Sequence, residues 1–268
     1  MSTRNRFALG SGKWIEHVFS EGPARSVQGR SRPTQRYLTA DHRGQMVIAE
    51  GGGASIARSL LEAMQNAGVV TRFKLEPFTL TRKDHGVDAT PDNLFQTSDG
   101  ETFVIEVKSS RYLTAEKIEN CIQVQAALAN SGMKYLLWTD TSPLPPALWR
   151  LLREMRRLGY SAIPRESIEQ LIHAISEKPK TVEELRQIGI YRDTILAAAW
   201  HGVAHFNLHG EFGDKTMVSN EVNARQFSRF LKSSIKTHVW WSGLPQSYVA
   251  LQSLGSKKST LTKESSHA

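Results

Sequence analysis

The sequence has little cysteine, no long apolar run and a shortage of acidic residues. Its 268 residues include a single cysteine, Cys121, so no disulfide can form within the chain. We expect this thiol to be a small buried group in the reducing cytoplasm. No apolar run approaches the ~20 residues that a membrane-spanning helix needs. Residues 1–6 are polar and basic with no apolar run behind them, which predicts a chain without a secretory signal.

The shortage of acidic residues leaves a formal net charge of +8 and an isoelectric point of about 9.6. Such a balance favours polyanionic partners. The excess is concentrated in residues 1–48, where Ser, Gly and Pro also interrupt any regular pattern. We therefore predict a basic, partly extended N-terminal arm over residues 1–48. Its expected phosphate contacts are Arg30, Arg32, Arg36 and Arg43.

Residues 90–108 carry the strongest local signal in the chain. An Asp-Gly pair at positions 99 and 100 lies between two segments with alternating apolar residues, which is typical of a β-hairpin. Side chains alternate between the faces of the second strand, so Glu106 and Lys108 share one face and Val107 lies on the other. The turn brings Asp92 back towards this end of the strand. The sequence therefore predicts two carboxylates and one ammonium group close together.

Two carboxylates beside a lysine suit the hydrolysis of a phosphodiester. Mg²⁺ or Mn²⁺ prefers oxygen ligands, and Asp92, Glu106 and the backbone carbonyl of Val107 are the expected ligands. The ion would stabilise charge on the phosphoryl oxygens and lower the pKa of a bound water. Lys108 would orient or activate that water and add positive charge. A Glu-x-Lys sequence alone is common on solvated strands, so the interpretation depends on the preceding Pro91-Asp92 and on the hairpin spacing.

The remaining pattern predicts an α/β fold with a mixed sheet. Apolar residues at helical spacing indicate helices, and short apolar runs between turn signals indicate strands. The expected helices cover residues 56–64, 115–131 and 147–158, and the expected further strands cover 37–39, 45–48, 69–73, 78–81 and 135–139. With the hairpin, this order predicts a restriction-endonuclease-like core over residues 49–164, with its site at one end of the sheet.

A second, smaller unit is expected over residues 165–224. Helices at 166–175, after Thr181 and at 192–202 precede short strands at 203–208 and 216–219. Thr181 is the expected N-cap of the middle helix, with glutamates in its first turn. This order is typical of a small helical, winged-helix-like domain, which can grip either DNA or a protein.

The last segment, residues 225–268, is expected to bind a partner. It begins with an amphipathic stretch that contains Phe227, Phe230 and Leu231, and it continues through an adjacent Trp240-Trp241 pair into a polar end. Tryptophan is a favoured anchor in protein interfaces.

The Asp92 and Glu106-Val107-Lys108 cluster resembles the PD-(D/E)xK nuclease motif, which many restriction and repair enzymes share. Over residues 30–219 the chain further resembles TnsA, the endonuclease subunit of heteromeric cut-and-paste bacterial transposases. Besides the motif, the resemblance depends on a basic Gly-Arg-Ser-Arg segment at 29–32, on Glu76-Pro77-Phe78, on the helix and strand of 118–140, and on the helical region ending at 201–216.

The resemblance implies a metal-dependent endonuclease that cuts the 5′ ends of a transposon during DNA transposition. The implied partner is a transposase of the integrase class, which cuts and joins the 3′ ends. The C-terminal domain is expected to contact this transposase and an AAA+ regulator ATPase. The implied substrate is double-stranded DNA at the transposon ends, and the implied location is the bacterial cytoplasm, in association with the nucleoid.

One position departs from the family pattern. TnsA-like chains usually carry a catalytic glutamate in the first helix, often as Glu-x-x-x-Glu, whereas this chain reads Glu50-Gly51-Gly52-Gly53-Ala54. Either Glu50 serves as the third carboxylate, or the position has been lost at Ala54, which would weaken metal binding and hydrolysis. Two alternatives stay open: a stand-alone restriction or repair nuclease, and a DNA-binding scaffold inactivated at Ala54. Glu62, two turns further along this helix, is expected to be exposed to solvent.

Overall fold

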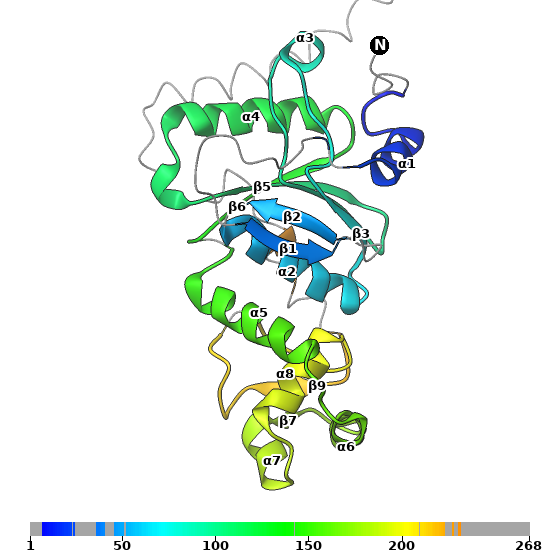
Figure 1. The fold of residues 1–268 in the computed structure, drawn as a ribbon, viewed down its shortest axis with the longest axis vertical. Helices are drawn as coiled ribbons and strands as arrows, with labels where there is room; N and C mark the ends of the chain where they lie inside the picture. Colours follow the sequence, from blue (N-terminus) through cyan, green and yellow to red (C-terminus); the bar gives the residue numbers. More distant parts are fainter. Residues whose placement is uncertain are drawn as a thin grey trace, which may run out of the picture.

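The chain folds as a mixed α/β protein (Figure 1). The computed structural model describes residues 7–22, 24, 36–40, 46–50, 52–141, 143–208, 210–222, 227, 230 and 231, without the side chains of 36–40, 46–50 and 52. In chain order the elements are α1 (Gly12–Ser20), β1 (Arg36–Ala40), β2 (Met46–Glu50), α2 (Gly52–Asn66), β3 (Val70–Leu75), α3 (Arg82–His85), β4 (Asn93–Thr97), β5 (Thr102–Lys108), the 3-10 helix η2 (Ser110–Tyr112), α4 (Ala115–Ala129), β6 (Lys134–Thr139), α5 (Pro146–Gly159), α6 (Arg165–Ile175), β7 (Lys180–Thr181), α7 (Val182–Gln187), α8 (Arg192–Trp200), β8 (His205–Phe206) and β9 (Met217–Ser219).

A four-stranded mixed sheet forms the centre of the fold, in the order β3-β4-β5-β6. The predicted hairpin is confirmed, because β4 and β5 pair antiparallel with Phe95 opposite Phe103, and those two rings stack at a centroid distance of 4.9 Å. Gly100 in the turn has φ +86°, a conformation that glycine adopts without steric cost. The last strand, β6, is parallel to β5, as expected for a strand that follows a crossover helix.

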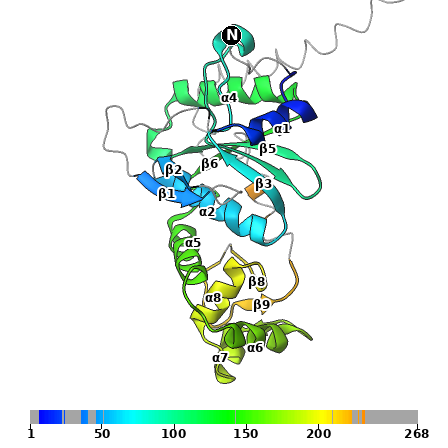
Figure 2. The same ribbon diagram turned by 45° about the vertical axis from the view of Figure 1, so that its right-hand side comes forward.

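Helices cover both faces of this sheet (Figures 1 and 2). Phe103 and Ile105 of β5 belong to a hydrophobic cluster with α2 and α5, whereas Val104 belongs to a second cluster with α1 and α4. The alternation predicted for β5 is therefore confirmed. It assigns Glu106 and Lys108 to the face covered by α1 and α4, and Val107 to the face covered by α2.

Helix α1 lies within the region that the sequence predicted to be an extended arm. It begins after Ser11, whose hydroxyl accepts a hydrogen bond from Trp14 N at 3.2 Å. The Trp14 ring is buried and meets Phe78 edge-on, with 4.9 Å between the centroids. At the other end of the helix, the buried Lys74 of β3 donates to two backbone carbonyls. The sequence predicted a partly extended arm over residues 1–48, and it did not predict this packed helix at residues 12–20.

Two further predictions about local structure have different outcomes. The strand predicted at 78–81 is absent from the described residues, which show only an isolated bridge between Leu80 and Ala89 beside α3. Thr81 is already the N-cap residue of α3, so the chain turns directly after Leu80 and only the two hydrogen bonds between Leu80 and Ala89 form among these described residues. The cap at Thr181 is confirmed as a full capping box, in which Thr181 and Glu184 each accept a hydrogen bond from the other's backbone N–H.

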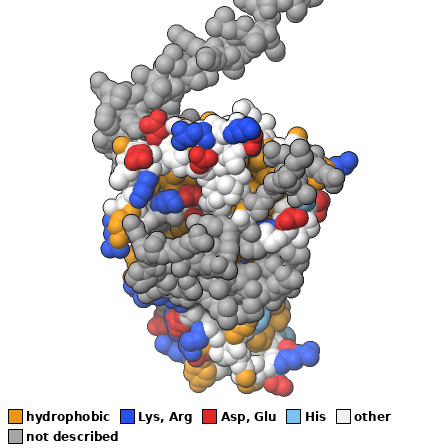
Figure 3. Space-filling view, turned by 45° about the horizontal axis from the view of Figure 1, so that its top comes forward, with side chains coloured by type: hydrophobic (Ala, Val, Ile, Leu, Met, Phe, Trp, Pro, Cys, Tyr) orange, Lys and Arg blue, Asp and Glu red, His pale blue; other side chains and the backbone are white. Residues whose placement is uncertain are grey.

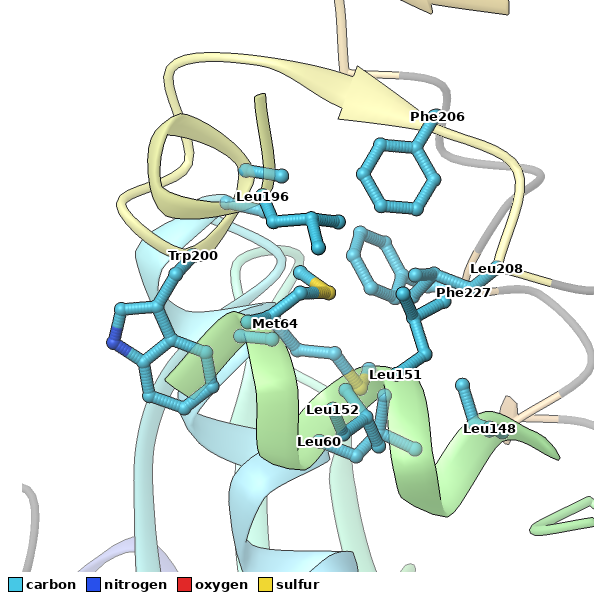
Figure 4. Close-up of a cluster of buried hydrophobic side chains, with 14 of the residues drawn as sticks. Leu60, Met64, Leu148, Leu151, Leu152, Leu196, Trp200, Phe206, Leu208 and Phe227 are labelled. Carbon is cyan, nitrogen blue, oxygen red and sulfur yellow. The ribbon is translucent and has the colours of Figure 1, made fainter. Parts of the chain in front are cut away.

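The C-terminal unit consists of α6, α7 and α8 with three short strands in the order β7-β9-β8. It is joined to the rest of the chain by one continuous hydrophobic cluster, shown in Figure 4. There Leu196 and Trp200 of α8 lie against Met64 of α2 and the leucines of α5. Phe227 is also buried in this cluster, so the first part of the predicted partner-binding tail packs into the chain's own core.

The described surface mixes charges of both signs. Figure 3 shows Lys and Arg side chains interspersed with Asp and Glu side chains over the upper part of the molecule. Large apolar side chains are exposed at Tyr112, Tyr160, Ile172, Ile188, Tyr191, Met217 and Val222. Among the helices that the structure describes, none combines the length and the apolar character that crossing a membrane would require.

Candidate active site

The predicted carboxylates meet at the end of the β4–β5 hairpin. Asn93 pairs with Ile105, so Asp92 and Glu106, one step further along, lie on neighbouring strands with their side chains on the same face. Asp92 Oδ2 accepts a hydrogen bond from the backbone N–H of Val107 at 2.6 Å. This contact fixes the carboxylate of Asp92 against the strand that carries the motif.

Lys108 forms an ion pair with Glu106 on the same face of β5. The Glu106 side chain is 14% exposed and the Lys108 side chain 36% exposed, so the pair lies at the edge of the protein rather than in bulk solvent. Burial alone would lower the pKa of Lys108, but the carboxylates of Glu106 and Asp92 outweigh it and raise this pKa above its ordinary value. In this state Lys108 is a fixed cation, which suits orienting and charge-stabilising roles better than proton abstraction.

Two neutral groups lie behind this cluster. Cys121 of α4 and Tyr135 of β6 are both buried, and burial raises the pKa of the thiol and raises that of the Tyr135 hydroxyl well above its ordinary value. The negative charges of Glu106 and Asp92 act in the same direction. Both groups therefore stay protonated near neutral pH, and the prediction that Cys121 is a buried free thiol is confirmed.

The start of α2 reaches the same strand end from the other face of the sheet. A Cβ at Gly53 would lie only 2.9 Å from Val107 Cγ1, so glycine permits this close approach. Ala54 is half-buried in the first turn of α2. Glu50 ends β2, and its side chain is not among those described. The predicted third carboxylate therefore belongs to a segment beside the motif, and its contacts lie outside the described residues.

The arginines predicted to bind phosphate lie mostly outside the described residues. Arg30, Arg32 and Arg43 lie outside the described residues, and of Arg36 only the backbone is described, as the first residue of β1. The antiparallel pair β1–β2, at the end of the predicted arm, matches the two strands predicted there, with Arg36 opposite Glu50.

Glu76 beside the carboxylates was not predicted as a site residue. It has φ +42°, an unusual conformation for a residue with a side chain, and such strain is often found at functional sites. Its N–H donates to the backbone carbonyl of Asp92 at 2.9 Å, and its own carbonyl accepts from Ala24 N at 2.8 Å. Glu76 thus anchors the segment that carries Asp92. The sequence signals this position only as part of the Glu76-Pro77-Phe78 segment.

Asn93, next to Asp92, was also missed. Its side chain is 0% exposed, and neither amide atom has a hydrogen-bond partner within the described part of the chain. A buried amide of this kind is rare and costs stability. It lies on the α2 face of the sheet, opposite to the face of Glu106.

Glu62 is not exposed as predicted. Its side chain is only 12% exposed and accepts a hydrogen bond from the Tyr160 hydroxyl at 2.6 Å. Arg58 and Arg156 lie 3.9 Å and 3.6 Å from its carboxylate. The prediction failed because the packing of α5 against α2 is a tertiary contact that helical periodicity cannot show.

The donor set fits a hard divalent cation. Asp92 and Glu106 place two carboxylates at one strand end, and with the Val107 carbonyl they would offer the oxygen ligands that Mg²⁺ or Mn²⁺ prefers. No group of three or more His, Cys, Asp or Glu side chains suited to holding a metal ion occurs among the described residues. A site with two carboxylates would leave several positions to water, as is usual for Mg²⁺.

Two comparisons with known proteins found no match. Neither the protein-family models nor the curated proteins include a match to this chain. The functional assignment therefore depends on the residues and geometry of the site.

Proposed function

We propose that this chain is a metal-dependent DNA endonuclease, and that it acts as the TnsA-like subunit of a transposase. The observation that carries the proposal is the clustering of Asp92, Glu106 and Lys108 at one sheet end, with Asp92 held by the N–H of Val107. Two carboxylates and a lysine in this arrangement suit phosphodiester hydrolysis. The net charge of +8 suits a DNA substrate.

Each residue has a distinct task in the proposed reaction. Asp92, Glu106 and the Val107 carbonyl would hold the Mg²⁺ or Mn²⁺, which supplies a water of lowered pKa and positive charge at the phosphoryl oxygens. Lys108, fixed by Glu106, orients the attacking water and offsets negative charge that develops during the reaction. The contact between Asp92 and Val107 keeps the ligands in position before substrate arrives.

The finer fold assignments are part of this proposal. The sheet order β3-β4-β5-β6 with α2 and α4 on opposite faces supports a restriction-endonuclease-like core. The three helices and three short strands that follow support a winged-helix-like unit. In a transposase this unit would contact the integrase-class subunit and the AAA+ regulator. This chain would cut the 5′ ends of the transposon and the integrase-class subunit would cut the 3′ ends.

The test is metal-dependent cleavage of labelled duplex DNA that carries transposon ends, with and without the partner transposase. We expect Asp92→Ala and Glu106→Gln each to lower the cleavage rate by at least ~100-fold. Glu101→Gln is the matched control, because Glu101 lies just before the same strand and its carboxylate pairs with the exposed Lys134. It should cleave at the parent rate.

The same assay separates the alternatives. Cleavage without the transposase would favour a stand-alone restriction or repair nuclease. Cleavage by Ala54→Glu alone would identify the parent as a nuclease that lacks one carboxylate. No cleavage by any variant, with DNA binding retained, would contradict the enzymatic proposal and favour a DNA-binding scaffold.

A further inference from the structure

A short segment after the motif places the aromatic ring of Tyr112 close to two cations, Arg111 and Lys117. η2 begins two residues beyond Lys108, and Arg111 is three residues from it, so their Cα atoms are at most about 11 Å apart. The segment therefore leaves the sheet at the end where Asp92 and Glu106 meet.

The segment is anchored by a carboxylate. Asp140, just after β6, accepts hydrogen bonds from Ser109 Oγ at 2.9 Å and from Ser110 N at 2.7 Å. Burial alone would raise the pKa of Asp140, but these hydrogen bonds outweigh it and lower the pKa, so the anchor is ionised near neutral pH. Because Lys108 pairs with Thr139 in the β5–β6 ladder, the anchor also fixes η2 relative to the motif.

The outer side of the segment is exposed and cationic. Tyr112 is 54% exposed, and the Arg111 guanidinium lies over its ring, 4.4 Å from the centroid. Lys117 Nζ lies 6.0 Å from the same centroid and donates to the Tyr112 carbonyl at 3.1 Å. Within the described part of the chain, neither Arg111 nor Lys117 forms an ion pair with a carboxylate.

The position of Lys117 is unfavourable for the isolated protein. It lies in the first turn of α4, capped by Thr114, where the helix dipole disfavours positive charge. Glu116 in the same turn offsets part of this charge. Lys117 thus adds its positive charge to those of Lys108 and Arg111 in the same stretch of chain, and an anionic ligand would stabilise this charge.

We propose that Arg111, Tyr112 and Lys117 bind the DNA strand next to the phosphodiester that is cut. The two cations contact successive phosphates, and the Tyr112 ring stacks on an unpaired base of that strand. Proteins that hold single strands combine positive grooves with aromatic stacking in this way. The inference rests on the proposed endonuclease function, because it takes its DNA strand from that function, but its test does not require cleavage.

The experiment measures binding of fluorescent DNA to the full chain carrying Asp92→Asn, which prevents cutting during the measurement. The probes are a blunt duplex and the same duplex with a three-base overhang. We expect Arg111→Ala with Lys117→Ala to weaken binding and to reduce the slope of log K against log salt by the value for two phosphate contacts, which is about 1.8 for a duplex and about 1.4 for a single strand. The matched control is Arg165→Ala, an exposed arginine on α6, which should change neither quantity.

The role of Tyr112 is tested by comparing the affinity of its variants for the overhang probe and for the blunt duplex. We expect Tyr112→Ala to weaken binding of the overhang probe about 5- to 100-fold, with a much smaller effect on the blunt duplex and no change in the salt slope. Tyr112→Phe should bind as the parent does, because it keeps the ring. Circular dichroism confirms that each exposed-residue variant is folded.

Several results would overturn the proposal. It fails if the variants bind both probes with the affinity and salt slope of the Asp92→Asn parent, or if that parent binds no DNA. If the unmutated chain cuts DNA while Arg111 and Tyr112 variants bind normally, the endonuclease function stands and this interface is wrong. If no cleavage occurs but the variants lose binding as expected, the interface stands without the nuclease.

Discussion

Lys74 and Lys108 are lysines on the same face of the sheet, yet their surroundings give them opposite tasks. Lys108 pairs with Glu106 at the strand end, where its charge is available to a substrate. Lys74 is buried, and its Nζ donates to the backbone carbonyls of Val18 and Glu21 at the C-terminal end of α1. These carbonyls have no partner within their own helix, so Lys74 replaces the water that they would otherwise bind.

We predict that Lys74→Met destabilises the chain by about 1–3 kcal/mol. Methionine keeps the apolar stem but leaves the carbonyls of the buried Val18 and of Glu21 without this donor, and α1 should detach first. Urea denaturation followed by far-UV circular dichroism measures the change.

The control for this prediction is Lys134→Met. Lys134 is exposed and pairs with Glu101, and such surface pairs contribute less than ~1 kcal/mol. Equal losses of stability for Lys74→Met and Lys134→Met would contradict the role given to Lys74.

At the scale of elements, most of the sheet could be predicted because its signals are local. The turn at Gly100 and the alternation of Val104 with Phe103 and Ile105 fix the hairpin and its faces without any distant contact. The placement of Asp92 next to Glu106 follows from that register. The sequence therefore predicted the strand and the face of Glu106, and it predicted that the turn brings Asp92 back towards Glu106, which the structure also shows.

Two features were not predicted from the sequence: helix α1, which lies in a stretch rich in basic residues, and the backbone conformation of Glu76, which depends on tertiary contacts. Helix α1 has buried side chains at Trp14, Ile15, Val18 and Phe19, a helical spacing that the surrounding basic residues obscured. Glu76 owes its backbone conformation to hydrogen bonds with Asp92 and Ala24, which come from two other segments. No periodicity in the sequence reports such contacts.

The small sheet of the C-terminal unit gives a prediction about pH. His205 of β8 is buried, and burial lowers its pKa below the ordinary 6.5. Below pH 6.5 an unfolded chain takes up a proton at this position while the folded chain does not. His205 therefore contributes stability that is present above pH 6.5 and is lost as the pH falls towards its folded pKa.

We predict that His205→Gln reduces the fall in unfolding free energy between about pH 6.5 and pH 5, by up to ~1.4 kcal/mol per pH unit. Urea denaturation at half-unit pH intervals measures this slope. Between pH 7 and pH 8 the curves of the parent and the variant should run parallel, whatever the offset between them. An unchanged slope below pH 6.5 would show that this histidine takes up its proton equally in both states.

At the scale of the whole molecule, the two units share a core and should unfold together. Figure 4 shows α8 lying against α2 and α5, with Trp200 and Met64 in the same cluster. Asn66 at the end of α2 donates to the Trp200 carbonyl at 2.6 Å. Helix α2 thus touches both the strand end that carries the motif, through Gly53, and the C-terminal unit.

Gly202 provides the test of this shared core. It has φ +71°, and a Cβ there would lie 2.0 Å from the Asn66 carbonyl oxygen. Gly189 has a similar φ of +85° but nothing within 4 Å of the added carbon, so Gly189→Ala carries the same backbone strain without the clash. We expect Gly189→Ala to cost about 1–2 kcal/mol and Gly202→Ala to cost about 1–3 kcal/mol more.

Denaturation followed by both tryptophan fluorescence and far-UV circular dichroism distinguishes a shared core from two separate ones. In a shared core the two probes give coincident transitions, and Gly202→Ala moves both to lower urea concentration. If instead Gly202→Ala unfolds the C-terminal unit in a separate, earlier transition, then α2 does not couple that unit to the strand end that carries Asp92 and Glu106. Equal costs for the two alanine variants would likewise show that the contact between Gly202 and Asn66 does not constrain the packing of α8 on α2.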